Sequence, residues 1–189
     1  MRRAIVLGAL AAVAAMLVWV LFVVLPTRGA QPAGNASAAA APTAPAGSGR
    51  KIKARLFYVA ADGVHLTHVE RDVAYGEGTL EQAREILAAQ VAAVSEPLVS
   101  AIPPGTTLKA LFLTEGGDAY VDFSREIVTA HSGGTSDELL TVYTIVNVLT
   151  ENLPAVTGVQ LLVDGKEVDT LAGHVDLRNP LGKNLAWVQ

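Results

Sequence analysis

The fold of this chain is decided by residues 135–168, which read TSDELLTVYTIVNVLTENLPAVTGVQLLVDGKEV. Thr135 is followed three residues later by Glu138, a spacing that matches a capping box and predicts a helix from Thr135 to about Asn152. Pro154 then ends the helix. The apolar residues form a face too wide for a solvated surface helix, so we expect burial of Leu139, Val142, Tyr143, Ile145, Val146 and Leu149.

Three β-hairpins are predicted around this helix. Residues 158–168 form one of them, because Asp164-Gly165 is a dipeptide that a two-residue type I′ turn favours. Runs of strand-forming residues on either side of short turns predict the other two hairpins, over residues 51–75 and 107–124.

A second helix is predicted between the first two hairpins, over residues 79–94. Thr79 and Gln82 again have capping-box spacing, and apolar residues recur at helical intervals. Hairpins joined this tightly imply antiparallel pairing. The sequence therefore predicts the α+β class: two layers, with an antiparallel sheet built from β-hairpins and two helices packed on one face, after an N-terminal transmembrane helix.

The first fifty residues differ in composition from the remainder of the chain. Residues 4–25 contain no charged side chain and are long enough for a membrane-spanning helix of about 33 Å. Two arginines precede this segment, which places the N-terminus in the cytoplasm by the positive-inside rule. We therefore predict a cytoplasmic tip and transmembrane signal anchor (1–25), an Ala/Pro/Gly-rich linker (26–50) and an extracytoplasmic domain (51–189). A cleaved signal peptide is the alternative, and it exports the domain as well.

The distribution of charge argues against nucleic-acid binding. All 18 acidic residues follow position 50, whereas four of the 14 basic residues precede position 51, namely Arg2, Arg3, Arg28 and Arg50. The predicted domain is therefore net acidic, a poor match to a phosphate backbone. The chain contains no cysteine, which rules out disulfides, thiolate metal sites and a cysteine nucleophile.

Five short motifs occur in order between residues 100 and 181: Pro103-Pro104-Gly105, Tyr120-Val121-Asp122, Tyr143 to Asn147, Leu162 to Gly165, and Gly173-His174-Val175-Asp176. Their order and spacing resemble those of the GerMN domain family of spore-germination and sporulation proteins, and the similarity covers most of residues 52–181. The resemblance implies an extracytoplasmic, non-catalytic domain. We expect no metal site and no cofactor. The motif residues are then expected to be structural: Pro103, Pro104, Gly105, Tyr120, Asp122, Tyr143, Asn147, Asp164, Gly165, His174 and Asp176.

Two histidine patterns invite a catalytic or metal-binding interpretation. His174 and Asp176 share a face of an extended segment and could form half of a hydrolytic triad, but no serine of the chain stands in a nucleophile-elbow motif. We favour a structural role in which both side chains bond the backbone of a C-terminal turn. His65 and His68 lie three apart on a predicted strand, so their rings should point to opposite faces, which favours surface histidines over a metal site.

Three further polar positions receive a structural interpretation. Glu138 is explained by the capping box and the helix dipole. Asp122 alternates with Tyr120 along a strand and is expected to be exposed. Tyr143 and Asn147 are four apart on a helix and share a face, which favours a buried structural pair and leaves a partner-binding face as the alternative.

These observations predict a non-catalytic protein-interaction or assembly module at the cell envelope. It would lie in the inner (cytoplasmic) membrane as a single-pass protein with its C-terminal domain outside, anchored by residues 4–25. Its partner would be an envelope protein or a second copy, bound through a sheet edge or a helix face. A peptidoglycan-binding accessory module is the alternative, and a cell-wall hydrolase is a third.

Overall fold

The structure is a computed structural model that describes residues 49–189. The predicted membrane span (4–25) and almost all of the predicted linker (26–50) lie outside these residues. Within residues 49–189, no helix is both long enough and apolar enough to cross a membrane.

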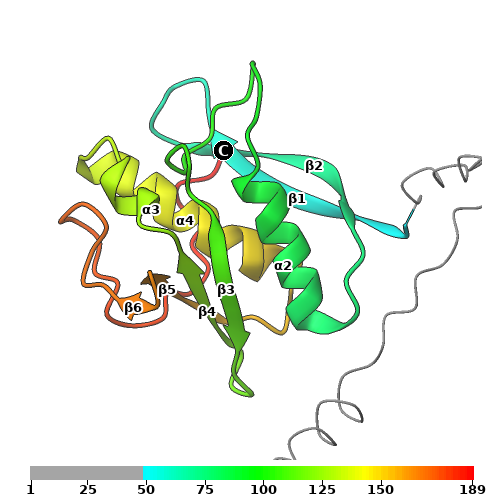
Figure 1. Cartoon of the computed structure of the whole chain (residues 1–189). Coiled ribbons are helices and arrows are strands. Elements are labelled where there is room, and N and C mark those ends of the chain that lie inside the picture. The colour runs from blue at the N-terminus through cyan, green and yellow to red at the C-terminus, as the bar shows by residue number, and fades with distance from the viewer. Residues whose placement is uncertain (1–48) are drawn as a thin grey trace, which may run out of the picture. The chain divides into compact units, whose positions relative to one another are not determined.

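The described residues form strands that are grouped around two long helices (Figure 1). In chain order the elements are β1 (Lys51–Val59), β2 (Leu66–Ala74), α2 (Gly78–Val91), β3 (Leu108–Leu113), β4 (Asp118–Phe123), α3 (Glu126–Thr129), α4 (Thr135–Asn152), β5 (Gly158–Val163) and β6 (Lys166–Glu167). The α+β class, the three hairpins and both long helices are therefore confirmed, and α4 has its predicted bounds. The short helix α3 was not predicted.

The strands form two sheets rather than the single antiparallel sheet that the sequence predicts. β1 pairs only with β2, whereas the other strands have the order β3-β4-β5-β6. β4 and β5 run parallel, with Asp118 opposite Gly158 and Phe123 opposite Val163. The prediction was wrong here because α4 carries the chain back to the starting end of β4, and a helical crossover of this kind joins parallel strands.

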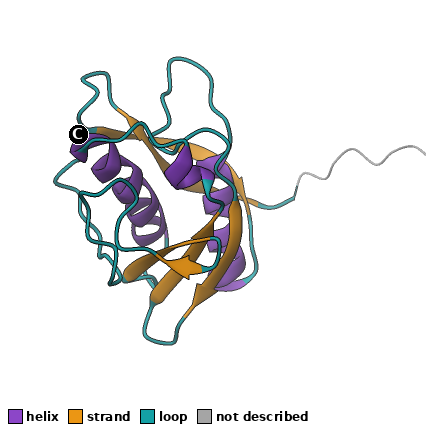
Figure 2. Cartoon of the chain, turned by 60° about the vertical axis from the view of Figure 1, so that its left-hand side comes forward, coloured by secondary structure: helices purple, strands orange, loops and turns teal. Residues whose placement is uncertain are grey.

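Both long helices contact both sheets, so the predicted packing on one sheet face is also wrong. α4 packs against β1 and β5, and α2 packs against β1, β2 and β3. Figure 2 shows the helices between two groups of strands. This position explains why 11 of the 18 residues of α4 are buried, polar ones among them.

Neither predicted capping box forms. The residue before α2 is Glu77 and the residue before α4 is Gly134, and no side chain caps either helix. Gln82 instead accepts a hydrogen bond from the Gly76 N–H at 3.1 Å and donates to the Ala74 carbonyl at 3.0 Å, so it joins α2 to the end of β2.

Candidate functional site

The outer edge of β1 is covered by side-chain amides. Gln90 accepts from the Phe57 N–H at 2.9 Å and donates to the Phe57 carbonyl at 2.7 Å. Asn152 makes the same pair of bonds to Arg55, both at 2.8 Å. The Val59 N–H donates to the Val99 carbonyl at 2.8 Å. Three successive outward-facing residues of β1 are thus occupied, and no further strand can pair there.

The outer edge of β2 is partly covered and otherwise charged. The C-terminal tail pairs with one end of it, since the Leu66 N–H donates to the Trp187 carbonyl and the Gln189 N–H donates to the Leu66 carbonyl. Further along, Glu70 and Asp72 are exposed. Charged side chains on an edge strand oppose pairing with another chain.

The β5 side of the second sheet is covered by the loop of residues 169–181. Val159 forms an antiparallel bridge with Leu181, and the Gln160 amide donates to the Leu177 carbonyl. Little of this side of the sheet is therefore available for strand pairing.

The same loop is held by Glu138, which is fully buried rather than part of a cap. Its carboxylate accepts from the Leu171 N–H at 2.7 Å and from the His174 N–H at 2.8 Å. Burial raises the pKa of Glu138. The backbone N–H groups of Ala172, His174 and Leu171 lower it, and because their combined effect is larger, the pKa of Glu138 lies below its usual value. The capping interpretation missed this role because the bonded loop is more than thirty residues away in sequence.

The edge of β3 is open only in part. The Thr114 N–H donates to the Asp118 carbonyl, so along the antiparallel hairpin the backbone N–H and C=O groups of Leu111 and Leu113 point away from β4. Among residues 49–189, no hydrogen bond reaches these outward groups. Leu111 is only 1% exposed, because α2 packs against β3 here. The outward groups of Leu113 are therefore the accessible part of this edge, which we call the open edge, and the neighbouring Phe112 is 58% exposed.

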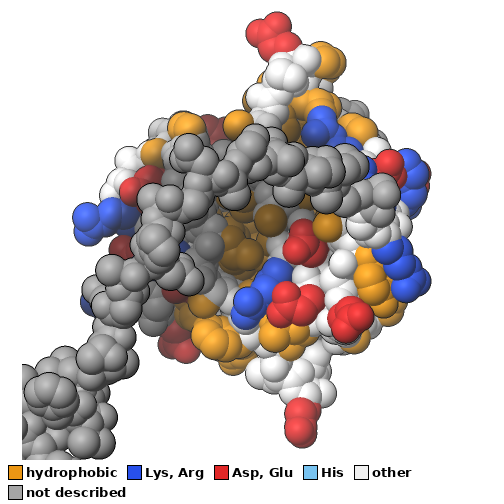
Figure 3. All heavy atoms as spheres, turned by 45° about the vertical axis from the view of Figure 1, so that its right-hand side comes forward, with side chains coloured by type: hydrophobic (Ala, Val, Ile, Leu, Met, Phe, Trp, Pro, Cys, Tyr) orange, Lys and Arg blue, Asp and Glu red, His pale blue; other side chains and the backbone are white. Residues whose placement is uncertain are grey.

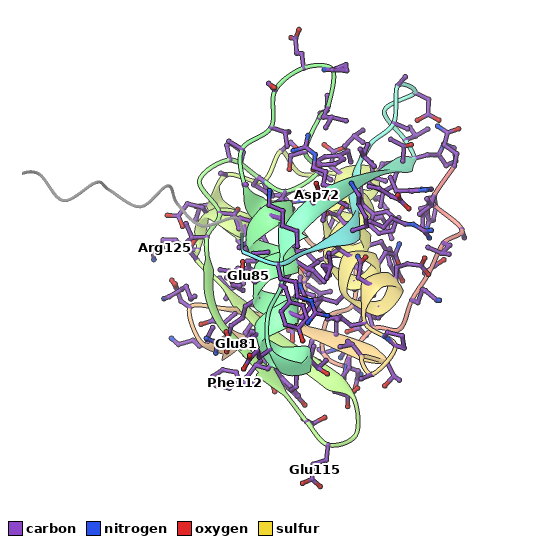
Figure 4. The ribbon with its side chains drawn as sticks, turned by 90° about the vertical axis from the view of Figure 1, so that its right-hand side faces the viewer. Asp72, Glu81, Glu85, Phe112, Glu115 and Arg125 are labelled. Atoms are coloured by element: carbon purple, nitrogen blue, oxygen red, sulfur yellow. The ribbon has the colours of Figure 1, made fainter. Side chains whose placement is uncertain are left out.

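Charged side chains surround the open edge. Lys109 donates to Asp164 at 2.8 Å, and Arg125 lies 3.9 Å from the same carboxylate. In the view of Figure 4, Phe112 lies between Glu115, in the turn of the β3–β4 hairpin, and Arg125, which follows β4. On the face seen in Figure 3, acidic and basic side chains are interspersed with hydrophobic ones. A groove of about 260 Å³ separates α2 from residues 108–111.

Four predicted motif residues shape the second sheet and its turns. Asp164 and Gly165 have φ angles of 49° and 75°, and Val163 pairs with Lys166, so the predicted type I′ turn is confirmed. Asp122 is buried, not exposed as predicted, because its Oδ1 accepts from the Gly165 N–H at 2.7 Å. Tyr120 is half-buried beside it.

The motif Pro103-Pro104-Gly105 forms a tight turn. The Thr106 N–H donates to the Pro103 carbonyl at 3.3 Å, and Gly105 has φ of 80°, the geometry of a type II turn with proline and glycine at its centre. The turn borders an apolar cavity of about 600 Å³ formed by residues 91–107.

Tyr143 and Asn147 do not bond each other. Asn147 is fully buried, donates to the Asn184 carbonyl at 2.7 Å and accepts from the Asn184 N–H at 3.0 Å. Tyr143 is half-buried. Asn147 thus joins α4 to the C-terminal tail.

His174 and Asp176 line the same surface pocket but do not bond each other. The His174 Nδ1 lies 3.2 Å from the Glu138 carboxylate, whereas Asp176 accepts from the Arg178 side chain and from its backbone N–H. These bonds hold the pKa of Asp176 well below its usual range. The two residues therefore lack the Asp–His contact of a hydrolytic triad.

A second set of triad-like residues also lacks the required order. Ser132 donates directly to Asp137 at 2.6 Å. His131 accepts from the Gly133 N–H at 2.9 Å and lies 3.2 Å from the Thr141 hydroxyl. Because no histidine stands between serine and carboxylate, the serine has no base to activate it.

The two histidines of the HLTH pattern occupy separate surroundings. His65 lies just before β2 and contacts Asp62 at 2.6 Å. His68 lies on β2, with its ring 6.2 Å from that of Phe57. In the described part of the chain, no three His, Asp or Glu residues are grouped as a metal site would require.

The fold and its edges define a small α+β domain in which two sheets enclose a pair of helices and the edge of β3 is left open at one end. The chain belongs to the Germane family, described as sporulation and spore germination, whose model matches residues 55–169. No curated protein matches the sequence.

Two solved structures share the fold. A crystal structure from Clostridium perfringens, of a protein assigned as a lipoprotein, is 22% identical, with a TM-score of 0.50 over 70% of this chain and 88% of that chain. The tandem GerMN domains of the sporulation protein GerM from Bacillus subtilis are 16% identical, with a TM-score of 0.55 over 70% of this chain and 46% of that chain. This chain therefore corresponds to about half of the tandem structure.

Proposed function

We propose that this protein is a non-catalytic interaction module of the cell envelope, anchored in the membrane by residues 4–25 and serving sporulation or germination where its host forms spores. The family description supports the biological role. The lipoprotein assignment of the relative from Clostridium perfringens supports an envelope location. The uncharged run of residues 4–25 supports the anchor.

The observation that carries this proposal is the open edge of β3. An exposed strand edge recognises an extended partner segment through main-chain hydrogen bonds, and neighbouring side chains supply the specificity. Of the sheet edges in residues 49–189, this one combines the unbonded backbone groups of Leu113 with the exposed aromatic side chain of Phe112. The partner is therefore expected to contact Phe112 and the end of β3 at Leu113.

The hydrogen-bond network supports a non-catalytic role. His174 is directed to the buried Glu138, and Ser132 bonds a carboxylate directly. Each of these polar groups has a partner that accounts for its position, and within residues 49–189 no serine is paired with a histidine that could act as its base.

The test is photo-crosslinking in the native host. A benzophenone amino acid replaces Phe112 in the full-length chain, and the matched control carries it at Val64, which is 48% exposed in the turn before β2. A protein adduct that forms at position 112 and not at position 64 is expected. Absence of any adduct at 112, together with pelleting of the full-length chain on purified peptidoglycan, would replace this proposal with the wall-binding alternative.

A further inference from the structure

We propose that the apolar cavity in the loop between α2 and β3 binds the long acyl chain of an ester, whose carbonyl oxygen accepts a hydrogen bond from the Thr106 hydroxyl. The residues that line this cavity include neither Phe112 nor Leu113. The inference therefore concerns a second site and goes beyond the proposed function.

The cavity has the size and depth of a ligand site. The chain between α2 and β3 forms a long loop (Figure 1), and residues 91–107 enclose a volume of about 600 Å³. Sites for small molecules commonly have volumes of about 300–1,000 Å³. Ile102 and Thr106 in its wall are each only 5% exposed, whereas Val99 is 56% exposed. The cavity thus joins an exposed rim to buried side chains.

The wall favours a neutral, saturated chain. Its apolar side chains are those of valine, alanine, leucine, isoleucine and proline, and none of its residues is charged or aromatic. Without a cation in the wall, a ligand carboxylate would lose its hydration and gain no partner. Without an aromatic ring, the wall offers no stacking surface to a planar ligand. An esterified acyl chain therefore fits better than a free fatty acid or an aromatic molecule.

One polar side chain of the wall lacks a hydrogen-bond partner. The Ser100 hydroxyl donates to the Ile102 carbonyl at 3.2 Å, and Thr107 is exposed to solvent. Thr106 is buried, and its hydroxyl has no partner among residues 49–189. A buried hydroxyl without a hydrogen bond costs free energy. A ligand that carries an acceptor oxygen beside an apolar chain would remove this cost.

The backbone on both sides of Thr106 is fixed. The Thr106 N–H donates to the Pro103 carbonyl at 3.3 Å across the proline-glycine turn. The Thr107 N–H donates to the Ser124 hydroxyl at 3.0 Å, which joins the loop to the end of β4. Because the residue is held before a ligand arrives, little conformational freedom is lost on binding.

A peptide segment matches this wall less well. Each residue of a peptide other than proline brings one N–H and one C=O group that need partners when buried. The side chains of the wall offer a single unpartnered buried group, the Thr106 hydroxyl. One carbonyl oxygen on an otherwise apolar chain matches that number.

Photolabelling of the full-length chain in lipid nanodiscs tests the site. The probe is the methyl ester of a long-chain fatty acid that carries a diazirine, and mass spectrometry should locate its label within residues 91–107. Val99→Asp places a charge on the exposed rim and should reduce this label about tenfold. The control is Val64→Asp, which alters an exposed valine that does not line the cavity. A label located elsewhere, or reduced equally by both substitutions, would overturn the inference.

A pair of threonine substitutions tests the role of the hydroxyl. Thr144 on α4 also has a buried hydroxyl without a partner, but it does not line the cavity. Thr106→Val and Thr144→Val each remove such a group and should each raise the Tm by about 2–4 °C. Only Thr106→Val should also lower labelling by the ester, about fivefold.

The matching diazirine alkane, which has no ester, should label wild type and Thr106→Val equally. If the ester also labels these two proteins equally, the carbonyl does not bond Thr106 and the inference is wrong. A protein adduct from a benzophenone amino acid at position 99 in the host would also overturn it, because a partner segment would then occupy the cavity.

Discussion

The two sheets of this domain differ in how far the backbone groups along their edges are bonded or covered. In the β1–β2 sheet, outward backbone groups are bonded by Gln90 and Asn152 or bordered by the charges of Glu70 and Asp72. In the second sheet, the loop of residues 169–181 covers β5 and α2 packs along Leu111, whereas the backbone of Leu113 is unbonded beside the exposed Phe112. Edges that are not used for binding are commonly protected against pairing. The contrast therefore identifies the end of β3 at Phe112 and Leu113 as the edge that this fold leaves available.

Removing the amide cover of β1 should have the largest effect on stability. Gln90→Leu leaves the N–H and C=O of Phe57 unbonded in a fully buried position, and we expect the free energy of unfolding to fall by about 2–4 kcal/mol. Urea denaturation of the full-length chain measures this loss.

The matched control is Asn152→Leu, whose partner Arg55 is only half-buried and can bond water instead. A smaller loss, about 1 kcal/mol, is expected there. Equal losses at the two positions would show that burial of the bonded backbone does not determine how much each side-chain amide contributes to the free energy of unfolding.

Loosening the cover on the β5 side should have the next largest effect. Glu138→Gln replaces a carboxylate that accepts from several N–H groups, and bonds to a charged acceptor contribute about 1.5–3 kcal/mol. His174→Ala removes only the ring contact and should cost less.

The Glu138 effect should depend on pH. Because the pKa of Glu138 is lowered in the folded state, its contribution is fully present above the usual glutamate value of about 4.3 and is lost as the pH falls through the lowered value. The difference in Tm between wild type and Glu138→Gln should therefore be largest near neutral pH and shrink in acid. A difference that grows in acid would contradict the carboxylate role.

Local patterns in the sequence were sufficient to predict the helices and strands but not how they pack and pair. The bounds of α4 and the Asp164-Gly165 turn follow from residues that contact their sequence neighbours. The parallel pairing of β4 with β5 depends on where α4 packs, which no local pattern specifies. A hairpin pattern also identifies two paired strands without showing which outer edge remains uncovered.

The same limit explains the misread polar residues. Glu138 and Gln82 were predicted to be caps from their spacing, and Gln90 and Asn152 carried no signal at all. All four side chains bond backbone outside their own helix, and those of Glu138, Gln90 and Asn152 reach over more than thirty positions. Phe112 did carry a signal: in TLKALFLT it alternates with Leu111 and Leu113, so burial of the two leucines places the aromatic ring on the opposite face of the strand.

Removing a hydrogen bond from the β5–β6 hairpin should have a smaller effect on the free energy of unfolding. Asp122→Ala removes the buried acceptor of the Gly165 N–H, and we expect a loss of about 1 kcal/mol in the free energy of unfolding. Asp164→Asn is the control, because asparagine also tolerates a positive φ and the residue is exposed. A greater loss from Asp164→Asn than from Asp122→Ala would mean that the turn depends on its ion pair with Lys109.

A charge beside the open edge should have the smallest effect on folding and a complete effect on association. Phe112→Lys places a charge on a side chain that is 58% exposed, and surface changes of this kind alter the free energy of unfolding by no more than about 0.5 kcal/mol. In a complex that covers Phe112, however, the lysine would carry its charge out of water into the interface, and this desolvation opposes binding. Denaturation of the purified chain and co-purification of envelope proteins from the host separate the two effects, with Val64→Lys as the control. A Phe112→Lys variant that folds normally and still retains its partner would show that Phe112 is exposed for some reason other than binding.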